Sequence, residues 1–444
     1  MCVINKYLPF ILFVFIALLN VKCSKTAFSD FNKSSGNADF SNYISVGNSI
    51  TQGYQDQGLY ESTQQYSYPA LIAQQMKLVN DSITDFKQPL ADGNGSGYLH
   101  LEYINAEMEL IYPDDVMYPG YGPSSSWDNF SDLKGQSFNN LGIAGIRLID
   151  CIGLDNSERI INYYTLNGAS LLGISNPFAS FLDWGSDPLL GGDPNEYVEH
   201  VRNSGATFFT CWMGNNDILG YAMNGAVEQS INIPSIGDIS ISKITPISDF
   251  REKYDSLLAS LTKNGAKGVC ATIPNVTSIP YFTTVTSDLY DHDIFIETKS
   301  GDVRAATTND LLLLSASSKI DELGGTSSSN PLESEYVIDV EEIIEVESAL
   351  IAFNTEIQTS AGYYGVAVVD IHSFFENMPS GITIDGITLT KKYIEGGAFS
   401  LDGVHPNPRG HAMLANEFIK TINDTYLSSI PLLNVGQYQG VIYP

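Results

Sequence analysis

Five short apolar runs recur along the chain, and they constrain its fold more than any other feature. Runs of this length, bounded by turn residues, are typical of strands that are buried on both faces of a parallel sheet. Segments with helical spacing separate them, and this alternation predicts βαβ units. The expected strands are residues 40–46, 136–141, 206–213, 268–273 and 364–371, and the expected helices are residues 68–78, 248–263, 340–360 and 408–422.

We therefore expect an α/β fold, a three-layer α/β/α sandwich around a five-stranded parallel sheet. Its first and third strands are expected to lie side by side at the centre of the sheet. The second helix has Ser248 and Asp249 as its expected cap and Asn264-Gly265 as its expected end. In open parallel sheets the ligand crevice lies at the carboxyl ends of the strands, so polar residues that follow a strand are candidates for a site.

Residues with the chemistry of a hydrolase stand at these positions. Ser49 follows the first run, and Asp402 and His405 lie three positions apart near the end of the chain. Serine, histidine and aspartate supply a nucleophile, a general base and an orienting group, and the hydroxyl is inert without the other two. The segments 140–145 and 214–217 follow two further runs and offer hydrogen-bond donors for an oxyanion.

Taken in order, these four segments resemble the sequence blocks of the SGNH (GDSL) hydrolase family. The resemblance spans residues 43 to about 422. Asn48 stands where the family more often has Asp, Ile50 stands where it more often has Leu, and long insertions separate the blocks. The resemblance implies a flavodoxin-like SGNH hydrolase fold with long loop insertions.

The resemblance also implies a role for each matching residue. Ser49 corresponds to the nucleophile, His405 to the base that takes its proton, and Asp402 to the group that holds the histidine tautomer. The oxyanion hole would consist of the Ser49 N–H, the Gly145 N–H and the Asn216 side-chain amide. No metal and no organic cofactor is expected. Among the other histidines, His411 is expected to be a surface or packing residue, and His372 lacks the D-x-x-H context of a base.

The N-terminus has the pattern of an export signal. Lys6 precedes an apolar stretch, residues 8–19, that is too short to span a bilayer. Residues 1–22 are expected to be a lipoprotein signal peptide, with Cys23 as the lipidated residue. Lys22 departs from the small residue usual at that position, so plain secretory cleavage remains an alternative. Residues 23–41 are expected to form a flexible tether, and residues 42–444 the hydrolase domain.

The net charge of −29 excludes the basic faces that nucleic acids and anionic membranes require. Three cysteines follow Cys23, which is too few for a disulfide framework. Cys211 and Cys270 lie inside apolar runs and are expected to be buried thiols. A bridge involving Cys151 remains open.

Four insertions rich in Gly, Ser, Asn and Asp are expected to form loops and hairpins around the crevice, near residues 89–133, 153–194, 223–247 and 281–331. The acidic segment 288–293 has oxygen ligands for a cation, but a solvated loop accounts for it better because no glycine-turn signature accompanies it. Four tyrosines that follow the nucleophile line a lipid or sugar site or pack against the insertions, namely Tyr54, Tyr60, Tyr66 and Tyr68.

These features together predict a serine ester hydrolase of the cell envelope, lipid-anchored to a bacterial membrane or secreted. Its partner is an ester substrate. A lipase-like acylhydrolase acting on acyl lipids and a carbohydrate O-acetylesterase acting on acylated glycans fit the residues equally well. An alternative of another class is a non-catalytic glycan-binding envelope lipoprotein that has kept the fold.

Overall fold

The computed structural model describes residues 33–443, apart from 82, 102, 105–109, 112–129, 168–175, 234–236 and 379. The predicted signal peptide, Cys23 and most of the predicted tether lie outside these residues. Across the described ranges, no helix is both long enough and apolar enough to cross a membrane.

The centre of the fold is a four-stranded, fully parallel sheet with the strand order β1-β4-β7-β12. In register, Ser45 pairs with Thr210, and Thr210 pairs with Val269. Each strand corresponds to one of the predicted apolar runs. The strands are β1 (Tyr43–Gly47), β4 (Phe208–Trp212), β7 (Lys267–Ala271) and β12 (Ala367–Val369).

Strand β4 shows why these runs are apolar throughout. All five of its residues are buried, because successive side chains point to opposite, equally covered faces. Phe208 packs edge-on against Tyr426, with 5.4 Å between ring centroids, and Trp212 packs against Tyr68 at 5.6 Å. Polar Thr210 is tolerated between them because its hydroxyl bonds the Ser45 hydroxyl at 2.8 Å.

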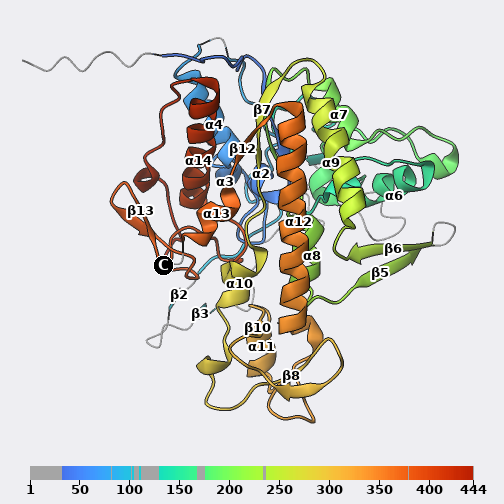
Figure 1. Cartoon of the computed structure of the whole chain (residues 1–444), viewed down its shortest axis with the longest axis vertical. Helices are drawn as coiled ribbons and strands as arrows, with labels where there is room; N and C mark the ends of the chain where they lie inside the picture. Colours follow the sequence, from blue (N-terminus) through green and yellow to red (C-terminus); the bar gives the residue numbers. More distant parts are fainter. Residues whose placement is uncertain are drawn as a thin grey trace, which may run out of the picture.

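Helices cover both faces of this sheet (Figure 1). One layer holds α4 (Tyr68–Lys77) and α14 (Pro408–Tyr426), which pack against each other. The other holds α7 (Tyr197–Asn203), α9 (Ile247–Thr262) and α12 (Val340–Tyr364), with α9 in contact with both of the others. The architecture is therefore the expected α/β fold, with a parallel sheet flanked by helices.

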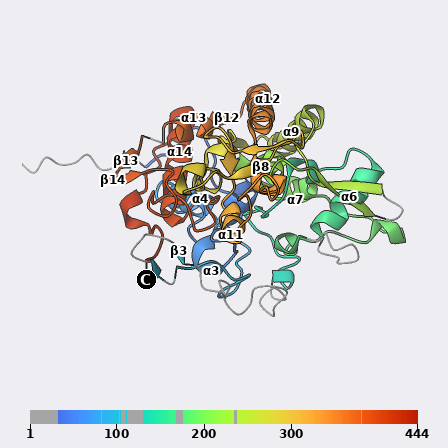
Figure 2. The same ribbon diagram turned by 90° about the horizontal axis from the view of Figure 1, so that it is seen from below.

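The insertions contribute shorter elements. Within the insertion 223–247, β5 and β6 pair antiparallel and lie on the same side as α6 (Asn156–Leu166), and β13–β14 lies on the opposite side (Figures 1 and 2). The segment after β7 has a small apolar core of its own, which includes Ile296, Leu312 and Val337. The paired short strands are β2 (Tyr103–Ile104) with β3 (Leu110–Ile111), β5 (Gln229–Ile233) with β6 (Gly237–Ser242), β8 (Phe295–Glu297) with β9 (Val303–Ala305), β10 (Leu311–Leu312) with β11 (Val337–Ile338), and β13 (Ile382–Ile384) with β14 (Ile387–Leu389).

The remaining helices are short. The α-helices are α2 (Ser49–Gln52), α3 (Glu61–Gln64), α6 (Asn156–Leu166), α8 (Asn216–Met223), α10 (Pro280–Thr283), α11 (Ala316–Asp321) and α13 (Ile371–Glu376). The 3-10 helices are η2 (Leu148–Asp150), η4 (Pro177–Ala179), η5 (Pro188–Leu190), η6 (Val276–Ser278), η7 (Ser287–Leu289), η8 (Ser334–Tyr336) and η9 (Val435–Gln437).

The prediction of a fifth strand at 136–141 was wrong. This segment lies along β1 and makes a single parallel bridge, Ser45 with Asn140. The Leu141 N–H donates to the Ser45 carbonyl at 2.8 Å, whereas the N–H groups of Asn139 and Asn140 donate to the Lys87 carbonyl, at 2.8 and 3.1 Å, and not to β1. The first and third predicted strands do lie side by side, as β1 and β4, but β1 is an edge strand of the four-stranded sheet rather than a central one.

The predicted cap of the 248–263 helix was also wrong. Helix α9 begins at Ile247, with Pro246 as its N-cap and no side-chain cap bond. The Ser248 hydroxyl instead donates to the neighbouring Asp249 carboxylate at 2.9 Å. The Pro246 side chain has no hydrogen-bond acceptor, so the helix begins without a side-chain cap.

Candidate active site

Ser49 lies immediately beyond β1, at the first residue of the four-residue helix α2. Asn48 caps this helix, and its side-chain oxygen accepts the Ile50 N–H at 3.2 Å. Gly47 is required between strand and helix, because a Cβ atom there would collide with the Thr51 hydroxyl. This tight strand-to-helix turn holds Ser49 at the carboxyl end of the sheet with 7% of its surface exposed.

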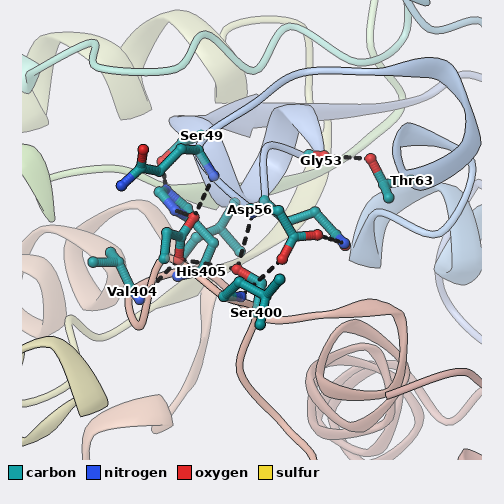
Figure 3. Close-up of polar contacts among 12 residues, drawn as sticks. Ser49, Gly53, Asp56, Thr63, Ser400, Val404 and His405 are labelled. Atoms are coloured by element: carbon teal, nitrogen blue, oxygen red, sulfur yellow. Dashed lines mark hydrogen bonds and ion pairs between the residues drawn. The ribbon is translucent and has the colours of Figure 1, made fainter. Parts of the chain in front are cut away.

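His405 lies beside Ser49 (Figure 3) and joins it to Asp402. Its Nε2 atom lies 2.8 Å from the Ser49 Oγ atom, and its Nδ1 atom lies 2.8 Å from Asp402 Oδ2. The three predicted residues therefore form one continuous hydrogen-bonded chain, although 356 positions separate the serine from the histidine. This is the arrangement that lets an imidazole accept a hydroxyl proton while a carboxylate fixes its other nitrogen.

Asp402 is held in its ionised form. Burial raises the pKa of this carboxyl, but the charge of His405 and hydrogen bonds from His405 and Val404 outweigh burial and lower the pKa to about 2. Oδ1 accepts the N–H groups of Val404 and His405 at 2.9 and 2.8 Å, and the Ser400 hydroxyl at 2.9 Å. A carboxylate fixed by this many donors is set in place before any substrate arrives.

Gly142 and Gly145 shape the second predicted segment in different ways. Gly142 lies against Thr51 and Gln52 so closely that a Cβ atom would overlap the backbone of α2. The Ala144 N–H donates to the Gln52 side chain at 2.7 Å, which also ties the segment to α2. Gly145 has a φ of 80°, in the left-handed region, and is exposed. The segment is thus anchored to the serine helix by Gly142, and Gly145 turns outward.

The third segment is bonded to the second. The Asn216 side-chain amide donates to the Ile146 carbonyl at 2.9 Å. Its neighbour Asp217 accepts the Leu148 N–H at 2.7 Å and the Thr245 hydroxyl at 2.7 Å. Burial raises the pKa of Asp217 to about 6, despite these donors. Asn216 and Asp217, the first two residues of α8, therefore fix the backbone of the residues that follow Gly145.

Two backbone N–H groups near this junction are left available. Among the described residues, no acceptor is found for the N–H of Ser49 or for the N–H of Gly145. The Asn216 amide uses one of its two hydrogens on Ile146, and the described residues offer no partner for the other. Unpaired donors are costly unless water or a ligand accepts them, and an oxyanion is such a ligand.

A comparison of the sequence with protein families shows the family to which the chain belongs. Residues 43–418 match the model of the GDSL-like lipase/acylhydrolase family, which covers most of the chain. The chain belongs to this family. It is therefore an enzyme of the esterase class, with ester substrates. No curated protein has a sequence that significantly matches this GDSL-like acylhydrolase.

Solved structures similar to this GDSL-like acylhydrolase are distant in sequence. They include LAE5, an α/β hydrolase from the metagenome of Lake Arreo (12% identity, TM-score 0.33, covering 87% of this chain and 96% of that one). A GDSL-like lipase candidate from Parabacteroides merdae is 10% identical, with a TM-score of 0.35 and coverage of 87% and 98%. An extracellular lipase from Streptomyces rimosus is 12% identical, with a TM-score of 0.32 and coverage of 86% and 98%.

In this acylhydrolase the four tyrosines after Ser49 have different surroundings. Tyr54 packs against the His405 ring, with 4.9 Å between ring centroids, and against Phe178 at 5.3 Å. Tyr68 is a core residue, stacked on Phe418. Tyr60 stacks on Tyr98, and Tyr66 contacts Tyr438. Of the four, Tyr54 therefore belongs to the site, a distinction that the sequence pattern did not make.

The competing histidines lie outside the hydrogen-bonded chain. His411 is fully buried, accepts the Tyr68 N–H at 3.2 Å, and has its pKa lowered to about 3 by burial, so it is a packing residue. His372 is the second residue of the short helix α13, where its N–H donates to the Thr272 hydroxyl at 2.9 Å.

The remaining candidates of the sequence analysis also lie apart from the serine. The segment 288–293 exposes Asp288, Asp291, His292 and Asp293, and the described part of the chain contains no group of three or more His, Cys, Asp or Glu residues placed to hold a metal ion. Cys151, Cys211 and Cys270 are buried free thiols, so among the described residues Cys151 forms no disulfide bridge.

Proposed function

We propose that this GDSL-like acylhydrolase is a serine ester hydrolase in which Ser49 is the nucleophile, His405 the general base and Asp402 the orienting carboxylate. The Ser49 N–H, the Gly145 N–H and the Asn216 amide form its oxyanion hole. The observation that carries the proposal is the unbroken pair of 2.8 Å contacts from Ser49 through His405 to Asp402. Burial and four donors to Asp402 add support, because they fix the carboxylate before substrate binds.

In the proposed reaction, the His405 Nε2 atom takes the Ser49 proton as Oγ bonds to the ester carbonyl carbon. The carbonyl oxygen becomes an oxyanion and accepts the free N–H groups. When the tetrahedral intermediate collapses, the bond from carbon to the alcohol oxygen breaks, and the imidazolium returns the proton to the departing alcohol. Water then attacks the acyl-enzyme by the same sequence, which releases the carboxylic acid and restores Ser49.

Two substrate classes fit this chemistry, acyl lipids and O-acetylated carbohydrates. A panel of p-nitrophenyl esters from acetate to palmitate separates them by chain-length preference. Turnover by the wild type and its loss in Ser49→Ala are the expected results. Equal turnover by Ser49→Ala on every ester would contradict the proposed mechanism. No turnover on any ester, together with binding of acylated glycans, would favour the non-catalytic alternative.

For location, we infer a lipid anchor at Cys23, on the basis of Lys6, the short apolar stretch and the cysteine at its end. The anchored protein would face the periplasm or the exterior. Cys23→Ala is expected to move the enzyme from the membrane fraction to the soluble fraction. Unchanged membrane partitioning of this variant would contradict the anchor, and a wild type found free in the medium would favour plain secretory cleavage.

A further inference from the structure

The tight turn at residues 55–58, which follows α2, is hydrogen-bonded to the loop that carries Asp402. Gln55 and Gly58 exchange two backbone hydrogen bonds, at 3.0 and 2.8 Å, across the residues Asp56 and Gln57. Both central residues have positive φ angles, 52° and 56°, as a type I′ turn demands. Neither is a glycine, so both residues hold a backbone conformation that costs conformational strain. The surrounding contacts must hold it.

Those contacts lead to the Asp402 loop. The Asp56 N–H donates to the Ser400 hydroxyl at 3.1 Å, and the Gln57 N–H donates to Asp402 Oδ2 at 3.1 Å. In the other direction, the Leu401 N–H donates to Asp56 Oδ1 at 2.8 Å. The Ser400 hydroxyl passes the connection on, since it donates to Asp402 Oδ1 at 2.9 Å. Figure 3 shows Asp56 and Ser400 beside His405 and Ser49.

Asp56 is itself an unusual residue for this place. Only 8% of its surface is exposed, and its Oδ2 atom accepts the Tyr60 hydroxyl at 2.7 Å and the Gln55 amide at 2.6 Å. A second buried carboxylate close to Asp402 is electrostatically unfavourable, since like charges repel in a poorly solvated site. Burial and the charge of Asp402 accordingly raise the pKa of Asp56. A group retained at this cost is a candidate for a positional role.

Resting on the proposed function, we propose that Asp56 is a positioning residue of the catalytic centre. Its carboxylate fixes the Leu401 backbone and its backbone N–H bonds the Ser400 hydroxyl, and through these two contacts the residue sets the placement of Asp402 against His405. Asp56 touches neither the serine nor the histidine, so its effect passes entirely through the acid loop. Ser400 is a second positioning residue, because its hydroxyl accepts the Asp56 N–H and donates to the Asp402 carboxylate.

The test compares Asp56→Ala, Asp56→Asn and Ser400→Ala by kcat and KM, with kcat expressed per active site from titration with a fluorophosphonate. A misplaced catalytic group costs up to about 100-fold in rate, so Asp56→Ala is expected to lower kcat about 10- to 100-fold with little change in KM. The two alanine substitutions combined should cost less than the product of their separate effects, because both act on Asp402.

Asp56→Asn is the conservative rescue. Its Oδ1 can still accept the Leu401 N–H, and its amide can donate to the Tyr60 hydroxyl. The Gln55 Oε1 atom, which has no partner among the described residues, can turn to accept the second amide hydrogen. Asparagine is therefore expected to restore most of the kcat that alanine loses. Asp56 and Ser400 line a cavity of about 540 Å³, so truncation opens onto existing space and the alanine variants are expected to fold.

Asp310→Ala is the matched control. Asp310 is equally buried, with 8% of its surface exposed, and its carboxylate accepts the Thr307 N–H at 2.7 Å, within the insertion that follows β7. This variant is expected to lose thermal stability and keep its kcat. Wild-type kcat in Asp56→Ala, or an equal loss in Asp56→Asn and Asp56→Ala, would overturn the positioning role. Failure of the proposed function looks different, because Ser49→Ala would then keep its turnover.

Discussion

The side chain of Asn216 holds the carbonyl of Ile146, one residue beyond Gly145, with 2.9 Å between amide nitrogen and oxygen. The amide is thereby aimed by the same loop whose N–H group it is proposed to assist. Asn216 and Gly145, the two proposed oxyanion donors outside α2, are thus held in fixed positions relative to each other. Asp217 strengthens this arrangement through Leu148.

Replacing Asn216 is expected to impair the transition state more than substrate binding. Loss of one oxyanion donor typically lowers turnover about 100- to 1,000-fold. Asn216→Ala should therefore lower kcat to this extent with KM nearly unchanged. Steady-state kinetics on the preferred p-nitrophenyl ester decide the matter. A raised KM at constant kcat would recast Asn216 as a residue that binds the ground state.

Ser49 and His405 are expected to act as one unit. Alanine at either position should remove most of the triad-dependent rate, about a million-fold in a comparable serine hydrolase, and the double variant should be hardly slower. Asp402→Ala should keep more activity, because Asp402 orients the base and takes no proton. Circular dichroism checks that each variant is folded. Multiplicative losses in the double variant would show that the two residues act independently.

The pH dependence of activity should show no titration of Asp402 in the usual range of an aspartate. The pKa of Asp402 is lowered to about 2, so this carboxylate becomes protonated only as the pH falls through that value. Asp402 should therefore stay ionised, and keep its bond to the imidazole, over the whole range in which the enzyme is assayed. A kcat/KM profile from pH 4 to 9 measures this, and an inflection near pH 4 that is lost in Asp402→Ala would contradict the lowered pKa.

Tyr54 is expected to matter through its ring rather than its hydroxyl. The ring packs on His405 and on Phe178, so it restricts the imidazole to the orientation that reaches Ser49. Tyr54→Phe keeps the ring and should retain wild-type kcat. Tyr54→Ala should lower kcat about tenfold, within the range that a loosened catalytic group costs. If the phenylalanine variant were as slow as the alanine variant, the hydroxyl would be the functional group.

Glu342 is expected to make the folded state less stable as the pH rises. It is 3% exposed in the first turn of α12, and burial raises its pKa to about 7. A raised folded-state pKa means that its contribution to stability is complete below about pH 4 and is lost as the pH rises through 7. Glu342→Gln, which can still accept the Asp339 N–H, should raise the Tm at pH 8 and change it less at pH 5. The exposed neighbour Glu341, replaced by Gln, is the control. A Tm difference that is the same at both pH values would exclude the titration of Glu342 as its cause.

The sequence predicted the elements whose signals are local. The apolar runs located β1, β4, β7 and β12, and Ser49, Asp402 and His405 were recognisable because short motifs surround them. The segment 136–141 lies along β1 with a single bridge and not as a full strand, and its apolar pattern did not reveal that the Asn139 and Asn140 N–H groups bond Lys87.

Other parts of the site have no local signal at all. Asp56-Gln57 forms a type I′ turn without the Asn-Gly pair that usually marks one. Its partners Ser400 and Leu401 lie more than 340 positions away in the sequence, at separations of 344 and 345. Tyr54 could not be distinguished from three nearby tyrosines, since only the folded chain brings His405 beside it.

The 356 positions between Ser49 and His405 have a consequence for the life of the nascent chain. During translation, the proposed nucleophile Ser49 leaves the ribosome long before its proposed base His405 has been synthesised. The growing polypeptide therefore lacks the pair that the proposed reaction needs. Hydrogen bonds also join the two terminal regions. The Asn37 N–H donates to the Tyr426 carbonyl, and Ser34 is bonded to Ser429. Closing contacts over such separations is slow and comes late in folding. If Ser49 and His405 act as proposed, esterase activity can therefore appear only after the segment that carries His405 has been synthesised and has packed beside Ser49.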